Sequence, residues 1–264
     1  MFESISRRGF LGMAPVMPFV LHGQSPAAPQ VTAVAASFPQ QEPEAVKEMV
    51  GVAHSNLARV KELVSARPAL ARASWDWGSG DWETAIDAAS HVGNRPIAEY
   101  LIANGARPTI YTAAMMGQLA IVKAWVEAMP GVQRNRGPHG ITLLAHARNG
   151  GPAAADVLKY LEALGDADPG YTDLPVTDAE FAAIGGDYRY GAGATERLKV
   201  ARNARGGVTF ARPGQSEHRL VHQGALVFMP AGAEAVRVRF DIADGKARGL
   251  TVEDGPSIVR APRA

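Results

Sequence analysis

The segment from Glu83 to Pro108 constrains the fold of this chain more than any other. It predicts two short helices, an alanine-rich one that stops at Gly93 and an apolar one that ends at Gly105-Ala106. Glycine suits such helix ends because it accepts a positive φ, and the proline that follows prevents the second helix from continuing. Two helices this short cannot bury their apolar faces alone. The segment therefore predicts neighbouring helix pairs of the same kind.

A similar pattern recurs three more times, in residues 44–64, 110–126 and 141–167. Gly117 and Gly150 correspond to Gly93, and paired alanines keep the first helix of a pair thin enough for its neighbours to stack. The spacing is uneven, because Gly117 follows Gly93 by only 24 residues, against a usual period of about 33 in arrays of such pairs. A tight turn is expected there. Long connections are expected at 74–83 and 133–140, where a specific function is best sought.

These helix pairs resemble ankyrin repeats over about residues 42–168. With the C-terminal region described below, they predict an α+β multidomain chain, in which an ankyrin-type α-solenoid of about four repeats precedes a small antiparallel β-barrel or sandwich domain. The resemblance implies protein–protein recognition through the loops and the concave face, an unidentified protein partner and no cofactor.

The N-terminus, residues 1–36, is predicted to be a signal peptide with a flexible linker. The run Ser6-Arg7-Arg8-Gly9-Phe10-Leu11 resembles the bacterial twin-arginine export motif, and an apolar stretch and small residues follow it. A chance arginine pair in a frayed terminus is the alternative. The resemblance implies a periplasmic or secreted protein without a stable membrane anchor after cleavage. The sequence contains no cysteine, so it can form no disulfide.

After a linker at 169–177, residues 178–264 predict a small β domain in which short strands alternate with turns such as Asp244-Gly245. Gly186-Asp187-Tyr188, Val238-Arg239-Phe240 and the run from Asp244 to Val252 resemble the β module appended to some beta-lactamase-like serine hydrolases. That module is an accessory, and the chain lacks the Ser-x-x-Lys nucleophile motif of those enzymes. The resemblance therefore implies no catalysis.

Composition excludes some functions and points to few. A net charge of +1 without a concentrated basic stripe argues against nucleic-acid binding. No catalytic motif and no metal-ligand motif is found. Ser216 is followed by Glu217 and His218 but lacks a complete nucleophile elbow, while His218 and His222, on one face of a strand, are expected to be solvated.

Binding is instead predicted at eight residues, namely Trp75, Trp77, Trp82, Tyr111, Met115, Arg134, Arg136 and His139. The tryptophans are either binding hot spots or a cap over the first helices. The loop with the two arginines and the histidine either binds an anion or acidic peptide, or is simply solvated.

Two alternatives stay open. The chain could be a periplasmic hydrolase or small-molecule binder with a site between the helical and β domains, built from Asp76, Asp81, Glu83, His91 and His146. It could also be a purely structural module. For His54, His91 and His146, hydrogen bonding within the helical array is expected.

Overall fold

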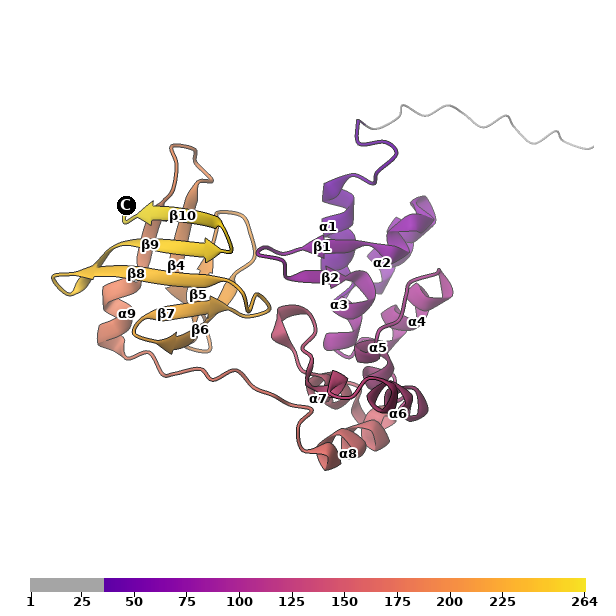
Figure 1. Ribbon diagram of the computed structural model, residues 1–264. Helices are drawn as coiled ribbons and strands as arrows, with labels where there is room; N and C mark the ends of the chain where they lie inside the picture. Colours follow the sequence, from indigo (N-terminus) through magenta and orange to yellow (C-terminus); the bar gives the residue numbers. More distant parts are fainter. Residues whose placement is uncertain (1–35) are drawn as a thin grey trace, which may run out of the picture. The chain divides into compact units, whose positions relative to one another are not determined.

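The computed structural model describes residues 36–264, of which Pro39–Ala264 form one unit with two kinds of structure, helices and a curved sheet (Figure 1). The predicted export motif at Ser6–Leu11 lies outside the described residues. Among the described residues, no helix has both the length and the apolar character needed to cross a membrane.

Eight α-helices occupy the first part of this unit, and side chains cap most of them. The oxygens of Asn56, Thr84, Asn94, Thr109 and Thr142 each accept the backbone N–H three residues ahead. Each such cap contributes about 1 kcal/mol. The helices are α1 (Pro43–Val52), α2 (Leu57–Ala66), α3 (Ala85–His91), α4 (Arg95–Ala103), α5 (Ile110–Met115), α6 (Leu119–Ala128), α7 (Leu143–Asn149) and α8 (Ala155–Leu164).

The predicted ankyrin solenoid is wrong. The helices are 6 to 10 residues long, and the segments that connect them do not repeat one common structure. A two-stranded hairpin, β1 (Ser74–Asp76) and β2 (Trp82–Thr84), precedes α3, whereas the 3-10 turns η2 (Val132–Arg134) and η3 (Pro138–Gly140) precede α7. In a solenoid, similar units stack on one another in a regular way. Connecting segments that differ this much do not produce such a regular stack.

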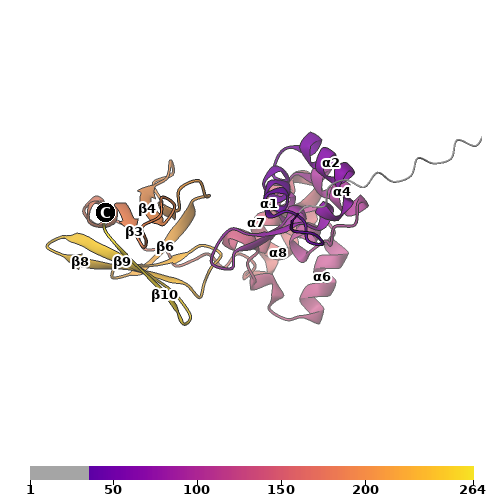
Figure 2. The ribbon, with the colours of Figure 1, turned by 90° about the horizontal axis from the view of Figure 1, so that it is seen from above.

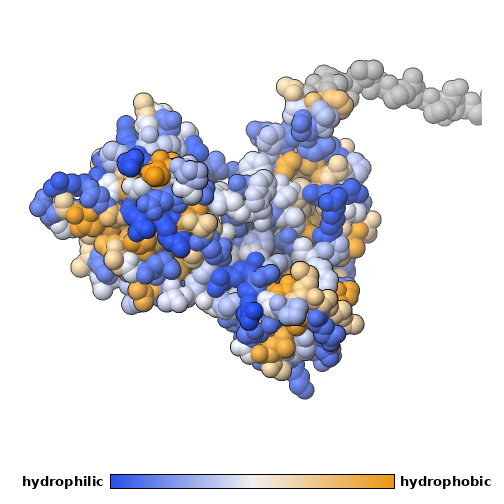
Figure 3. Space-filling view, in the orientation of Figure 1, coloured by the Kyte–Doolittle hydropathy of each residue, from blue (hydrophilic) through white to orange (hydrophobic). Residues whose placement is uncertain are grey.

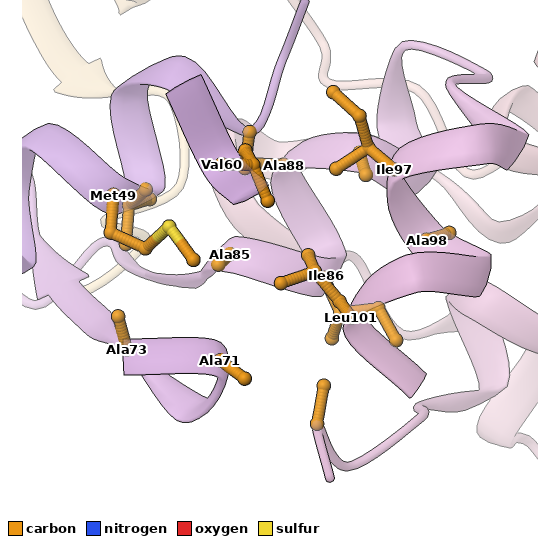
Figure 4. Packing of buried hydrophobic residues seen from close by; sticks show 14 of the residues in the cluster. Met49, Val60, Ala71, Ala73, Ala85, Ile86, Ala88, Ile97, Ala98 and Leu101 are labelled. Carbon is orange, nitrogen blue, oxygen red and sulfur yellow. The ribbon is translucent and has the colours of Figure 1, made fainter. Parts of the chain in front are cut away.

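Two apolar clusters hold the helices together. The first includes Met49, Ile86 and Leu101 and joins α1 to α4, the end of α5 and the 3-10 helix η1 (Pro68–Arg72) (Figure 4). The second joins α5 to α8. Buried alanines between the helices let them approach closely, as predicted from the sequence.

Glycine is required where the backbones approach closest. Gly117 has a φ of 74°, and a Cβ there would collide with the carbonyl of Ala153. Gly150 does not follow the prediction: its φ is −68°, and Gly151 takes the positive value instead, 64°. A Cβ on Gly150 would still collide with the carbonyl of Met115. Close helix packing therefore accounts for both glycines.

The remainder of the unit is a nearly closed antiparallel sheet with one helix, α9 (Asp178–Ile184), which starts with a capping box of Thr177 and Glu180. The strand order is β10-β9-β8-β7-β6-β5-β4-β3, and a bridge between Tyr188 and Arg263 links the two edge strands. Figure 2 shows the sheet from above. The strands are β3 (Gly186–Arg189), β4 (Arg197–Arg202), β5 (Val208–Ala211), β6 (His218–Gly224), β7 (Val227–Pro230), β8 (Arg237–Ala243), β9 (Lys246–Asp254) and β10 (Ser257–Pro262).

The sheet has its own apolar core, in which Ile184, Tyr188 and Phe228 are fully buried. On the outside, hydrophobic and hydrophilic residues are intermixed on the face shown in Figure 3. The largest exposed apolar side chains of α6, Ile121 and Trp125, lie one turn apart.

Candidate metal centre

The hairpin β1–β2 carries a carboxylate into the interior of the helical part. Strand β2 places Glu83 between Trp82, which is 61% exposed, and Thr84, which caps α3. The Glu83 side chain is fully buried, and its Oε2 accepts a hydrogen bond of 2.7 Å from the indole N–H of Trp77. A buried carboxylate is costly unless both oxygens find partners, so the surroundings of Oε1 decide what this residue does.

Three histidines from distant parts of the chain converge on Glu83 Oε1. Its distance is 2.9 Å to Nε2 of His91, the last residue of α3, and 3.4 Å to Nε2 of His139, in η3. The distance to Nε2 of His54, just after α1, is 3.7 Å. One ligand atom from each of these four residues lies within 4.8 Å of all the others. We call these four residues the His3Glu cluster.

Oε1 of Glu83 is nevertheless without a hydrogen-bond partner, although it is buried. His91 Nε2 is close enough to it, but no bond of suitable direction forms between them. That nitrogen is instead hydrogen-bonded to Nε2 of His54, at 3.0 Å. Native structures leave few buried polar atoms unsatisfied, and each one calls for an explanation such as an ion that belongs there.

Hydrogen bonds on the far side of two imidazole rings fix which nitrogen faces the cluster. Nδ1 of His54 lies 2.9 Å from the carbonyl of Gly51, and Nδ1 of His139 lies 2.7 Å from Oδ2 of Asp81. Because a carbonyl only accepts, Nδ1 of His54 carries the proton and its Nε2 presents a lone pair to the cluster. Metal-bound histidines are oriented by partners of this kind.

The loop that carries His139 is strained, and Asp81 holds it in place. His139 has a φ of 59°, which costs a non-glycine residue on the order of 1–3 kcal/mol. Its backbone N–H donates to Oδ1 of Asp81 over 2.8 Å, so that this buried carboxylate accepts from both the main chain and the side chain of one residue. Strain that is maintained in this way is typical of functional sites.

The charges of the cluster are strongly coupled. Burial would raise the pKa of Glu83, but close polar contacts with His139 and His91 outweigh it and lower the pKa to about 2. Burial would lower the pKa of His139, but its hydrogen bond to Asp81 and its close contact with the Glu83 carboxylate raise it to about 10. Without a metal, the cluster therefore holds a carboxylate against an imidazolium.

A cavity of about 250 Å³ opens beside the cluster. Two members of the cluster, His54 and His139, form part of its wall, whereas Glu83 and His91 do not. The remaining wall consists of Trp77, Ser216, Glu217 and His218.

The three tryptophans predicted to bind a ligand take different positions. Trp75 and Trp77 are half-buried and pack on the first apolar cluster, whereas Trp82 points outward. Trp77 also holds Glu83 and lines the cavity, so it belongs to the site.

The other predicted site residues are dispersed. Tyr111 packs on His146, and Met115 is fully buried in the first apolar cluster. Arg134 is exposed beside Asp166, and Arg136 donates to the carbonyl of Pro169 over 2.9 Å. Neither arginine contacts His139, which joins the His3Glu cluster instead.

No sequence motif indicates the metal-ligand set. Its four members are separated by 29, 8 and 48 residues, and the sequence predicts its three histidines to be structural or loop residues. Glu83 and His91 do belong to the group of five residues named above for the alternative of a hydrolase. The expectation that both strand histidines are solvated is wrong for His222, which is buried against Phe228, and His218 bonds the carbonyl of Trp77.

His146 is a separate buried histidine. Its Nδ1 bonds the carbonyl of Thr142 over 2.8 Å, its Nε2 has no partner, and burial lowers its pKa to about 4. In the unfolded chain the pKa is about 6.5. Protonation therefore favours unfolding, and the stability that a neutral His146 preserves is lost as the pH falls from about 6.5 towards 4.

Replacing His146 by Phe is expected to remove this acid sensitivity. The Thr142 carbonyl keeps its bond from the backbone N–H of residue 146, and the new ring still packs on Tyr111. Between pH 7 and pH 5, the wild type should lose about 2 kcal/mol more unfolding free energy than H146F, as urea titrations would measure. Equal losses in both proteins would contradict the assignment.

Asp81→Asn is expected to weaken metal binding by about 10–100-fold, because one of the two acceptors for His139 becomes a donor. Competition with a chromogenic chelator would measure the affinity. Asp76→Asn is the matched control, since Asp76 lies in the same hairpin and bonds only the N–H of Gly78. An unchanged affinity in D81N would contradict the orienting role of Asp81.

No family model matches this sequence, and no curated protein and no solved structure is significantly similar to it.

Proposed function

We propose that this protein binds one divalent transition-metal ion, with zinc as the best fit, through Nε2 of His54, His91 and His139 and the carboxylate of Glu83. The observation that carries the proposal is the convergence of three imidazole nitrogens on a buried carboxylate oxygen that has no hydrogen-bond partner. A cation between these atoms would satisfy all four at once.

The chemistry of the donor atoms favours zinc. Imidazole suits Zn, Cu, Fe and Ni, whereas Mg²⁺ and Ca²⁺ prefer sites made of oxygen alone. Tetrahedral zinc with bonds of 2.0–2.1 Å places its ligand atoms about 3.3 Å apart. The distances from Glu83 Oε1 to the three nitrogens, 2.9 to 3.7 Å, bracket this value. Small side-chain shifts would complete the coordination.

A bound metal ion would also fit the charges of the Glu83 and Asp81 carboxylates. The depressed pKa of Glu83 keeps it anionic and ready to bind a cation. Asp81 remains as a second carboxylate behind His139, where it strengthens that imidazole as a ligand. Since the metal takes the place of the proton on His139, binding should release a proton.

The test is a titration of the metal-stripped full-length protein with Co²⁺, a coloured substitute for zinc. One equivalent should produce the visible absorption of a four- or five-coordinate site, and one equivalent of Zn²⁺ should displace it. His91→Ala should abolish the signal, and the control Glu217→Gln, which changes a residue of the cavity wall outside the four ligands, should retain it. No saturable absorption in the wild type, or an undiminished one in H91A, would refute the proposal.

We also propose recognition of a protein partner as a second function, which the exposure of Trp82 favours. This side chain is 61% exposed next to a residue of the cluster, and large exposed aromatics are common binding hot spots. If the proposal holds, Trp82→Ala loses a protein that the wild type captures from cell extract, while the metal content stays at one per chain. Identical capture by both forms would contradict it.

A further inference from the structure

We propose that the metal centre is catalytic, and that its metal-bound water hydrolyses a neutral acyl substrate, an ester, amide or lactone, bound in the adjoining cavity. This inference rests on the proposed metal site. It adds to it an open coordination position, a substrate class and a proton acceptor, Glu217.

The proposed metal site can be reached from the cavity. Side chains of His54 and His139 are 28% and 34% exposed, and both line the cavity of about 250 Å³, whereas those of Glu83 and His91 are at most 11% exposed and form the closed side. A metal held by all four therefore has one face buried and one face towards the cavity. Water or a small molecule can reach that face.

The histidine and carboxylate ligands are of the kind that catalytic zinc sites use. Structural zinc sites are usually closed and rich in cysteine, whereas catalytic sites use histidine and carboxylate ligands and keep a position for water. This chain has no cysteine, and its helical part already has two apolar clusters. Zinc with four protein ligands can still accept a fifth on its open side, because it expands to five-coordination during catalysis.

The residues of the cavity wall favour an uncharged substrate. The described residues that line the cavity include no lysine and no arginine, and they include the carboxylate of Glu217. Such a wall disfavours phosphate esters and other polyanions, so a neutral carbonyl compound fits better. The half-buried indole of Trp77, fixed by its bond to Glu83, offers an apolar surface to such a molecule. The volume suits a small acyl compound.

The step itself requires no other reagent. The metal lowers the pKa of its bound water, and Glu217, the one carboxylate in the cavity wall outside the cluster, accepts the proton. The resulting hydroxide attacks the carbonyl carbon, and a C–O bond forms. The bond to the leaving alcohol or amine then breaks, and the proton passes from Glu217 to the leaving group. The products are a carboxylic acid and an alcohol or amine.

The open position is tested with azide on the Co²⁺-loaded full-length protein. Azide should change the visible spectrum in a saturable way, because it occupies the position facing the cavity. A bound cobalt whose spectrum does not respond to azide would overturn this inference and leave the metal site intact. Absence of cobalt binding would overturn both.

Hydrolysis is tested on the zinc-loaded protein with 4-nitrophenyl acetate, a thioester and a γ-lactone. Saturable turnover of at least one is expected, with loss in the metal-stripped protein. Glu217→Gln should lower kcat by about 100-fold or more while leaving zinc content and azide binding unchanged. Turnover equal to that of the stripped protein for all three compounds, or an undiminished kcat in E217Q with its zinc retained, would overturn the assignment.

Discussion

Replacing Glu83 by Gln is expected to weaken zinc binding by more than 100-fold. The substitution keeps the shape of the side chain and a carbonyl oxygen that can accept from Trp77, but it removes the negative charge on which His54, His91 and His139 converge. Changing an outer residue of a metal site already costs 10–100-fold in affinity, and a direct ligand should cost more. Competition titration against a chelator of known affinity would measure the loss.

Glu217→Gln provides the matched control. It makes the same chemical change in the wall of the neighbouring cavity, at a carboxylate that is not among the four ligands. Its zinc affinity should equal that of the wild type. If E83Q bound zinc as tightly as E217Q, Glu83 would not be a ligand, and its buried oxygen would need another explanation.

Removing the metal is expected to destabilise the protein substantially. A ligand at 1,000 times its Kd that binds only the folded state contributes about 4 kcal/mol. For a chain of this size, this corresponds to a fall in Tm of roughly 8–16 °C when a chelator strips the protein. The physical source is the loss of the metal bonds, which leaves Oε1 of Glu83 buried without a hydrogen-bond partner.

Differential scanning calorimetry with and without chelator would measure this shift, and added zinc should reverse it. The E83Q variant should show almost no response to either reagent, since it begins without metal. A wild-type Tm that is unaffected by the chelator, with metal removal verified by elemental analysis, would contradict a metal that bridges these elements.

Local structure followed well from the sequence where the relevant interactions are local. The two helices predicted between Glu83 and Gly105 occur as α3 and α4, and Asp244-Gly245 lies between two paired strands. Each depends on side chains within a few residues of one another. Gly117 was likewise expected at a positive φ, and it has one.

The repeat architecture and the site did not follow, because both depend on contacts between distant residues. Similar helix pairs suggested one repeating unit, but the hairpin before α3 and the 3-10 turns before α7 give each pair a different neighbour. The cluster assembles His54, Glu83, His91 and His139 from four elements, and only the packing of those elements brings them together. The density of aromatic and acidic residues at 75–83 was the one local signal that pointed towards it.

A crystal structure of the zinc-loaded full-length protein, with anomalous data collected at the zinc edge, would show directly whether the cluster binds the metal. One strong peak per chain is expected, about 2.0–2.2 Å from Nε2 of His54, His91 and His139 and from a carboxylate oxygen of Glu83. A peak at any other place, or the absence of a peak with Glu83 Oε1 hydrogen-bonded to a histidine, would contradict the proposed metal site.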